Sequence, residues 1–376
     1  MMGIRMIIFL LIFLSIYGGM NFYAFVRAKS IFHFSGMTQF IITIFLVLLI
    51  LAPIIIKLVE KLHLETAARS IAYLGYLWMA FIFLFCFFNL TFDIARYGLK
   101  FFYQNAGSLP MKNFFFSLSV LLAVSSVIYG FFDAKKIRIQ KLEIHTSKRL
   151  PQDGRIRIVQ ISDVHVGLII RGKRLENILD RVDEFKPDIL VSTGDLLDGE
   201  LDNVTPEAVK FAQITAKYGK FAVTGNHEYY AGIKKSLEFT KKAGFEVLQD
   251  EVREVADINL VGLNDETGRK FKRVDDKELF HRLMPGNVNN QFTLLLRHQP
   301  YVNHDNHFDL QLSGHTHGGQ IFPFMFFTRL MFPKNYGYYK LEADKAVYVS
   351  KGAGTWGPPV RFLAPPEITV IEIINK

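Results

Sequence analysis

Two histidines stand two residues apart in the segment Ser313–Gln320, which reads SGHTHGGQ. Glycines on both sides of the pair add no core volume and let the backbone approach another group closely. On extended backbone, side chains at positions i and i+2 point to the same side of the chain. His315 and His317 therefore predict a site for a metal ion or a phosphate group. Because single pairs of this kind also occur in solvated loops, the prediction requires partners elsewhere in the chain.

Four further motifs of similar composition contain such partners. They are Asp163-Val-His165, Gly194-Asp195, Gly225-Asn226-His227-Glu228 and Arg297-His298-Gln299-Pro300. Each of the five motifs follows an apolar run that is typical of a short buried strand, namely 156–162, 189–193, 221–224, 292–296 and 309–312. Ligands of open α/β sheets gather at the carboxyl ends of strands, so the five motifs indicate one common site.

Seven side chains in these motifs are candidate metal ligands: Asp163, His165, Asp195, Asn226, His298, His315 and His317. Seven ligands exceed the needs of one tetrahedral ion and suit two ions that share one carboxylate, as in two-metal hydrolases. A set rich in imidazole favours Mn, Fe, Zn or Co over Ca and Mg, which prefer oxygen ligands. Two such divalent ions would hold a bridging hydroxide at neutral pH and keep a positive charge that attracts phosphoryl groups.

The elements that must position these motifs alternate between strands and helices. A sixth strand-like run covers 259–262, and helical patterns cover 173–184, 206–217 and 233–242. Short apolar strands that alternate with helices are typical of a buried sheet covered by helices. We therefore expect an α/β domain over residues 137–376.

The N-terminal part of the chain, residues 1–136, has a different character. It contains four apolar stretches, each close to the length that crosses a bilayer as a helix: Met6–Val26, Thr38–Leu58, Ile71–Thr91 and Asn113–Phe132. We therefore predict a transmembrane domain of four helices. The single cysteine of the chain, Cys86, lies within an apolar stretch, which excludes a disulfide framework and a thiolate metal cluster.

The basic charge follows this division of the chain. Residues 1–136 contain 11 basic and 4 acidic residues, and so carry most of the formal net charge of +9. An excess located around apolar segments argues against nucleic acid as a partner. If the N-terminus lies inside, eight basic residues flank the inner ends of the four spans and five flank the outer ends. The positive-inside rule therefore places residues 137–376 in the cytoplasm.

Taken in order, the motifs DxH, GD, GNHE, the histidine of RHQP, and GHTH resemble those of the calcineurin-like metallophosphoesterase family. The resemblance extends from about Ile156 to Ile373. The segments SGHTHGGQIFP and GAGTWGPPVRFLAPPEITVIEI are similar to a bacterial membrane-associated branch, which includes enzymes that cleave the pyrophosphate of UDP-2,3-diacylglucosamine. The resemblance implies a β-sandwich flanked by helices, with the metal ions at the strand ends.

The resemblance also implies a role for each residue. Asp163, His165 and His317 would bind the first metal ion, Asn226, His298 and His315 the second, and Asp195 would bridge the two. His227, which directly follows Asn226, would be the catalytic acid that protonates the leaving oxygen, a task that suits an imidazole near neutral pH.

We therefore expect a phosphoesterase of the bacterial cytoplasmic membrane that hydrolyses a phosphodiester or pyrophosphate bond, with a phosphorylated lipid as a candidate substrate. Two other functions stay open. One is a phosphodiesterase for nucleotides or other soluble substrates that the helices only tether. The other is a non-catalytic membrane sensor or transporter that binds phosphorylated ligands, although the few charges within the spans argue against a transport path.

Several residues near the motifs have two interpretations. Asp198 and Glu228 either orient the ligands through hydrogen bonds or are solvated. Arg361 either contacts a substrate phosphate or forms a surface salt bridge. The other histidines are expected at the surface or in supporting positions: His33, His63, His145, His281, His304 and His307.

An apolar segment, Ile321–Phe332, directly follows the histidine pair and its glycines. It is too short to span a bilayer. It either packs in the core of its own domain or forms an apolar lip beside the metal site, which holds acyl chains or enters the membrane surface. Phe326 and Phe327 lie at its centre.

Overall fold

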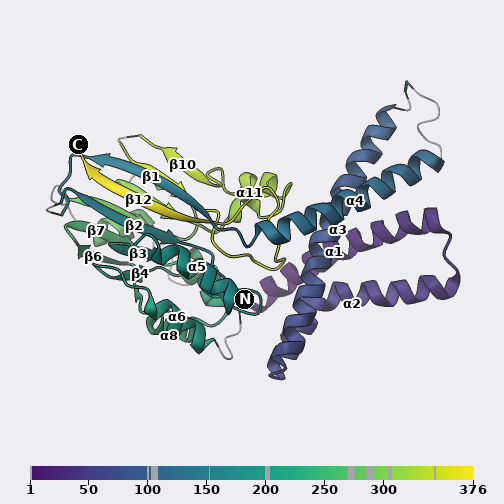
Figure 1. Ribbon diagram of the computed structural model, residues 1–376, viewed down its shortest axis with the longest axis horizontal. Coiled ribbons are helices and arrows are strands. Elements are labelled where there is room, and N and C mark those ends of the chain that lie inside the picture. Colours follow the sequence, from purple (N-terminus) through teal and green to yellow (C-terminus); the bar gives the residue numbers. More distant parts are fainter. Residues whose placement is uncertain are drawn as a thin grey trace. The chain divides into compact units, whose positions relative to one another are not determined.

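The computed structural model describes residues 2–99, 101–102, 109–151, 153–199, 204–269, 276–284, 291–303, 307–342 and 344–376. The chain divides into two compact units, one formed by residues 1–132 and 357–360, the other by residues 133–356 and 361–376. Figure 1 shows long helices in the first unit and two layers of strands in the second.

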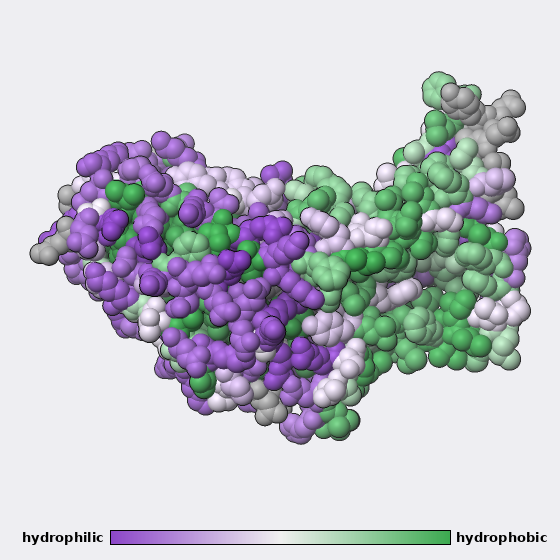
Figure 2. All heavy atoms as spheres, in the orientation of Figure 1, coloured by the Kyte–Doolittle hydropathy of each residue, from purple (hydrophilic) through white to green (hydrophobic). Residues whose placement is uncertain are grey.

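Among its described residues, the first unit contains four long helices, each of which includes one of the predicted apolar stretches. They are α1 (Met2–Phe32), α2 (Gly36–Lys61), α3 (Glu65–Leu99) and α4 (Leu109–Asp133). All four are long and apolar enough to cross a membrane. Hydrophobic residues dominate the surface of this unit, whereas the visible surface of the other unit is mostly hydrophilic (Figure 2). These features indicate that the chain is integrated in a membrane.

A group of polar side chains joins α1 to α3. Arg27 of α1 and Arg96 of α3 both contact the carboxylate of Asp93, and Tyr23 donates a hydrogen bond of 3.0 Å to the same carboxylate. Charged groups within membrane helices are costly unless they are paired. The pairing therefore lets these charges lie between the helices and holds α1 against α3.

The second unit contains two six-stranded sheets. The first has the order β1-β12-β2-β3-β4-β5 and the second β10-β11-β9-β8-β7-β6. The strands of the first sheet are β1 (Arg138–Thr146), β2 (Arg155–Ile161), β3 (Ile189–Ser192), β4 (Lys220–Ala222), β5 (Glu246–Val247) and β12 (Glu367–Asn375). Those of the second are β6 (Glu251–Val255), β7 (Ile258–Gly262), β8 (Phe292–Leu296), β9 (Leu310–Ser313), β10 (Gly337–Lys340) and β11 (Ala346–Val349). Strands β2 to β5 are parallel to one another, as are β7, β8, β9 and β11.

The main hydrophobic core lies between the two sheets. It combines residues such as Ile158 and Val191 of the first sheet with Leu260 and Leu294 of the second. Figure 1 shows α5 (Lys173–Asp183), α6 (Thr205–Gln213) and α8 (Ile233–Lys242) beside the first sheet. On the second sheet, α10 (Asp276–Leu283) packs Leu279 and Phe280 in a separate apolar cluster. The remaining helices are short: α7 (Asn226–Tyr230), α9 (Glu266–Arg269), the 3-10 turn η2 (His317–Gly319) and α11 (Met325–Met331).

The expected fold class is confirmed: an α/β chain with four apolar helices followed by a sandwich of two sheets flanked by helices. All six predicted strands occur within two residues of their expected bounds. The helix predicted over 206–217 is wrong at its end, because α6 stops at Gln213 and Ile214 has extended backbone. The sequence did not indicate β1, β5, β6, β10, β11 or β12.

Candidate metal centre

The five motifs occupy the loops that follow β2, β3, β4, β8 and β9. Because these strands run in parallel within their sheets, their carboxyl ends bring the loops together. Three groups of His and Asp side chains there are close enough to hold metal ions, and they share members with one another.

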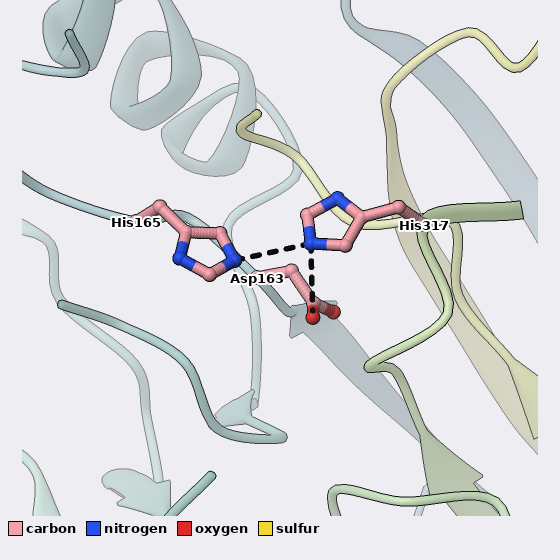
Figure 3. Close-up of side chains that lie close together, drawn as sticks. All are labelled: Asp163, His165 and His317. Atoms are coloured by element: carbon pink, nitrogen blue, oxygen red, sulfur yellow. Dashed lines mark hydrogen bonds and ion pairs between the residues drawn. The ribbon is translucent and has the colours of Figure 1, made fainter. Parts of the chain in front are cut away.

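The first group contains Asp163, His165 and His317. The Nε2 atoms of the two histidines face each other at 3.0 Å, and Asp163 Oδ1 lies 3.5 Å from Nε2 of His317 (Figure 3). Ser162 and the backbone amide of His315 donate hydrogen bonds to the Asp163 carboxylate. Three donor atoms therefore converge on one point, and the carboxylate is held in place from behind.

The second group gathers around His298. Its Nδ1 donates to the carbonyl oxygen of Thr193 at 2.8 Å, which leaves Nε2 directed into the site. Nε2 of His298 lies 3.1 Å from Nδ1 of His315 and 3.2 Å from Oδ1 of Asn226. An amide oxygen and two imidazole nitrogens thus converge on a second point.

Asp195 lies between the two groups. Its Oδ2 is 3.2 Å from Nε2 of His298 and 3.8 Å from Nε2 of His165. Its Oδ1 accepts a hydrogen bond of 2.9 Å from the backbone amide of His227. Oδ2 therefore faces an imidazole nitrogen of each group, while the backbone amide of His227 engages Oδ1.

The backbone of these loops differs from the expectation. His315 and His317 were expected on extended backbone, but both have positive φ, 73° and 51°, and so have Asp163 and His165, at 50° and 53°. Asp195 also has positive φ. Such conformations are uncommon for residues other than glycine and concentrate at functional sites. This backbone also directs the two histidines of the pair to different groups: His315 joins the second group and His317 the first.

Two glycines of the motifs are required by close approach to the carboxylates. A Cβ atom on Gly225 would lie 2.2 Å from Asp195 Oδ1, and one on Gly314 would lie 2.3 Å from Asp163 Oδ2. Any side chain at either position would displace a carboxylate. The glycines around the histidines therefore make room for the site itself.

Glu228 is buried and fixes two of the loops. Its carboxylate accepts hydrogen bonds from the backbone amides of Asp195, Leu196, Leu197 and Gly225. Asp198 lies nearby, with its Oδ1 3.4 Å from Nδ1 of His165, but that buried nitrogen has no hydrogen-bond partner among the described residues. The orienting interpretation is therefore confirmed for Glu228, through its hydrogen bonds to the backbone of the Asp195 and Gly225 loops.

Arg361 occupies a position that neither interpretation anticipated. It is fully buried, and its guanidinium donates to the carbonyl oxygens of Gly354 and His317 and, at 2.9 Å, to Nδ1 of His317. Both the surface salt bridge and the phosphate contact are therefore wrong. Since a guanidinium can only donate, Nδ1 of a neutral His317 accepts and its proton resides on Nε2. A metal ion at Nε2 would displace that proton.

The electrostatics of the cluster suit a cation. Burial and the charge of His298 lower the pKa of His315 to about 3, and burial and Arg361 lower the pKa of His317 well below its ordinary value. Burial opposes ionisation of Asp195, but His298 and His227 outweigh it and hold the pKa of this carboxyl well below its ordinary value. Burial opposes the charge of His298, but Asp195 outweighs it and raises the pKa of His298 well above its ordinary value, while burial raises the pKa of Asp163. His315 and His317 are thus held neutral and Asp195 ionised, as metal binding requires, whereas His298 and Asp163 would release a proton to the ion they bind. The donor set therefore fits divalent ions.

His227 lies at the edge of this cluster. Its Nδ1 donates to the carbonyl oxygen of Asp198 at 2.6 Å, so Nε2 is the nitrogen left for another partner. Its ring packs edge-on against His165 and lies 5.9 Å from Trp356, a residue that the sequence did not single out. The WGPP segment was visible only as part of the family resemblance, with no chemical pattern of its own.

The remaining predicted positions lie away from the centre. His33, His63, His145, His281 and His307 are exposed, as expected, whereas His304 lies outside the described residues. In the segment Ile321–Phe332, the two end residues are buried, but Phe326 and Phe327 are exposed. The alternative that places this segment in the domain core is therefore wrong for its central part.

Comparisons with known proteins identify the family of this chain. The family model for the calcineurin-like phosphoesterase matches residues 156–319, which contain all seven candidate ligands. An uncharacterized metallophosphoesterase of Aquifex aeolicus is 39% identical over 265 residues, which cover 69% of this chain and 98% of the relative. The chain belongs to the calcineurin-like phosphoesterase family. It is a metal-dependent phosphoester hydrolase.

Two further relatives extend the likeness within the calcineurin-like phosphoesterases. An uncharacterized metallophosphoesterase of Helicobacter pylori (strain 26695) is 30% identical over 369 residues, covering 95% of this chain and 96% of the relative. A Danio rerio protein named transmembrane protein with metallophosphoesterase domain is 29% identical over 270 residues, covering 68% of this chain and 62% of that protein. These relatives and the four apolar helices of this chain both support a phosphoesterase that is embedded in a membrane.

Proposed function

We propose that this phosphoesterase works with two divalent ions that share Asp195. Asp163, His165 and His317 would hold the first ion, and Asn226, His298 and His315 the second. The observation that carries the proposal is the position of Asp195 Oδ2, which faces an imidazole nitrogen of each group. The imidazole-rich set favours Mn, Fe, Zn or Co. When bound, two such ions lower the pKa of a water ligand and offset the negative charge of a phosphoryl group.

His227 is the acid of the proposed reaction. The carbonyl oxygen of Asp198 holds Nδ1–H, and the buried ring packs against His165, so the orientation of the imidazole is fixed. Nε2 can then deliver a proton to the oxygen of the leaving group. The closeness of His227 to His165 and Asp195 also permits a ligand role, which metal analysis of a His227 variant tests directly.

The helical part, residues 1–136, anchors the catalytic part, residues 137–376. The excess of basic residues beside the inner ends of the spans favours a cytoplasmic catalytic domain, and the relatives in Aquifex aeolicus and Helicobacter pylori favour a bacterial cytoplasmic membrane. An enzyme anchored in this way meets substrates that reside in the bilayer. We assign it the hydrolysis of a phosphodiester or pyrophosphate bond of a phosphorylated lipid.

The test is a comparison of substrates with the full chain in detergent. The protein, reconstituted with Mn, is incubated with phosphorylated lipids and with soluble nucleotide phosphodiesters, and products are identified by mass spectrometry. Faster turnover of a lipid supports the proposal. Equal or faster turnover of soluble nucleotides would favour an enzyme that is only tethered, and binding without turnover would favour a sensor.

A further inference from the structure

Helix α11 exposes large apolar side chains where a folded domain normally buries them. All seven of its residues lie in the described part of the chain, and none of them is buried. The exposed fractions are 56% for Phe326, 59% for Phe327, 82% for Leu330 and 72% for Met331. Clusters of exposed apolar side chains mark surfaces that bind an apolar partner.

Both ends of this helix are fixed to the loop that carries the metal-site histidines. At the N-terminal end, Gly319 approaches Met325 so closely that a Cβ atom would lie 2.4 Å from the Met325 backbone. At the C-terminal end, the ring of Phe332 lies 5.0 Å from the ring of His315. In addition, Thr316 donates a hydrogen bond to the carbonyl oxygen of Asn335. The exposed surface of α11 and the histidine loop therefore form one rigid piece.

The charges around α11 match an anionic apolar surface. Arg329 projects from the helix as an exposed residue, and Lys334 follows it. No acidic residue occurs from Gln320 to Lys340 in the sequence. Aromatic and aliphatic residues combined with basic ones are typical of helices that lie in the interfacial region of a bilayer, next to lipid phosphates.

The helices of the chain itself keep the catalytic domain next to a bilayer. Its four apolar helices are long enough to cross a membrane, and only four residues separate the end of α4 at Asp133 from the start of β1 at Arg138. We propose that α11 inserts Phe326, Phe327, Leu330 and Met331 into the interfacial region of the membrane that the chain spans. This inference rests on the proposed function and deepens it, because docking of α11 holds the metal loop at the surface where a phosphorylated lipid presents its headgroup.

Fluorescence quenching by lipids tests the docking without any turnover. Cys86 is replaced by alanine, Phe327→Cys is introduced and labelled with an environment-sensitive fluorophore, and the full chain is placed in nanodiscs with brominated or ordinary lipids. The matched control is Val209→Cys, because Val209 is 54% exposed and lies on α6, which Figure 1 shows on a different side of the sheet unit from α11. We expect brominated lipids to reduce the emission at position 327 at least about twofold and to leave position 209 unchanged.

Equal emission at position 327 in both kinds of nanodisc would overturn the docking. Emission typical of an apolar environment at position 327 that brominated lipids do not quench would also overturn it. A second copy or another part of the chain would then cover α11. Adding Asp195→Asn separates this inference from the proposed function. Quenching should persist in that variant although hydrolysis is lost, whereas an active protein without quenching would leave the function standing and remove the docking.

Discussion

Two neighbouring segments of this chain invert the usual distribution of polar and apolar residues. In the loop Ser313–Gly319, polar residues such as Ser313, Thr316 and His317 are buried, whereas α11, which begins six residues later, exposes its phenylalanines. Soluble domains normally show the opposite arrangement. A buried polar cluster is costly unless its groups are satisfied, and an exposed apolar cluster indicates a partner that covers it. We propose two different partners for the two segments, a cation for the loop and lipid for the helix.

The largest effect is expected from Asp195→Asn, which removes the charge that both groups of the site share. Hydrolysis should fall at least about a thousandfold, since the charge stabilisation of the reaction is lost. The melting temperature should change little, because Asp195 belongs to a loop at the strand ends. Asp344→Asn, at a 98% exposed side chain, is the control. Near-normal turnover of Asp195→Asn with Mn would show that the shared carboxylate has no catalytic part.

A smaller effect is expected from His227→Ala. Without the proton donor, the rate should fall about a hundredfold or more, while the metal content stays at the wild-type value. Substrates with good leaving groups should lose less, because they need little protonation. Turnover of substrates that span a range of leaving-group pKa, with exposed His307→Ala as the control, checks this. Loss of metal from His227→Ala would instead identify His227 as a ligand.

Arg361→Lys tests whether the Arg361 guanidinium stabilises the loop that carries His317. A lysine cannot reproduce the planar set of donors that contacts Gly354 and both the carbonyl oxygen and Nδ1 of His317. We expect a loss of about 2–4 kcal/mol in the free energy of unfolding and a metal affinity about tenfold weaker. Chemical denaturation and metal titration measure the two effects. Arg149→Lys is the matched control at a mostly exposed side chain, and equal results for both variants would rule out this supporting role.

The smallest effect on stability is expected at α11. Replacing both Phe326 and Phe327 by serine should change the free energy of unfolding by only about 0.5 kcal/mol, because exposed residues contribute little. Turnover of a lipid substrate in nanodiscs should nevertheless fall about tenfold, since apolar burial in the bilayer is lost. Turnover of a small soluble phosphodiester should fall much less. A lowered melting temperature together with equal loss on both substrates would mean that α11 packs against protein.

The sequence indicated most of the site but less of the scaffold. The strands that lead to the site were predictable because both of their faces are buried, which makes them short apolar runs such as Phe292–Leu296. Strand β1 was missed because its exposed positions carry charged residues, and β5 because it has only two residues. Edge strands of this kind are defined by their neighbours more than by their own composition.

Two features of the site could not be read from residue types. The left-handed backbone of Asp163 and His165 is held by hydrogen bonds from their amides to Gly194 and Asp195, which lie far away in the sequence. Arg361 stands in a segment rich in proline and glycine that suggests a surface loop, yet it is fully buried and donates hydrogen bonds to the carbonyl oxygens of His317 and Gly354. Tertiary contacts therefore determine both features. The candidate ligands, in contrast, could be predicted from residue types and their spacing alone.

The number of metal ions per chain tests the proposed two-ion centre most directly. The full chain is loaded with Mn in detergent, freed of excess metal and analysed by inductively coupled plasma mass spectrometry, alone and as Asp163→Asn and Asn226→Ala variants. We predict two ions in the wild-type chain and one in each variant, because each substitution removes a ligand from a different group. One ion or none in the wild-type chain would contradict the proposed centre. So would a variant that loses all metal and keeps the activity of the wild-type chain.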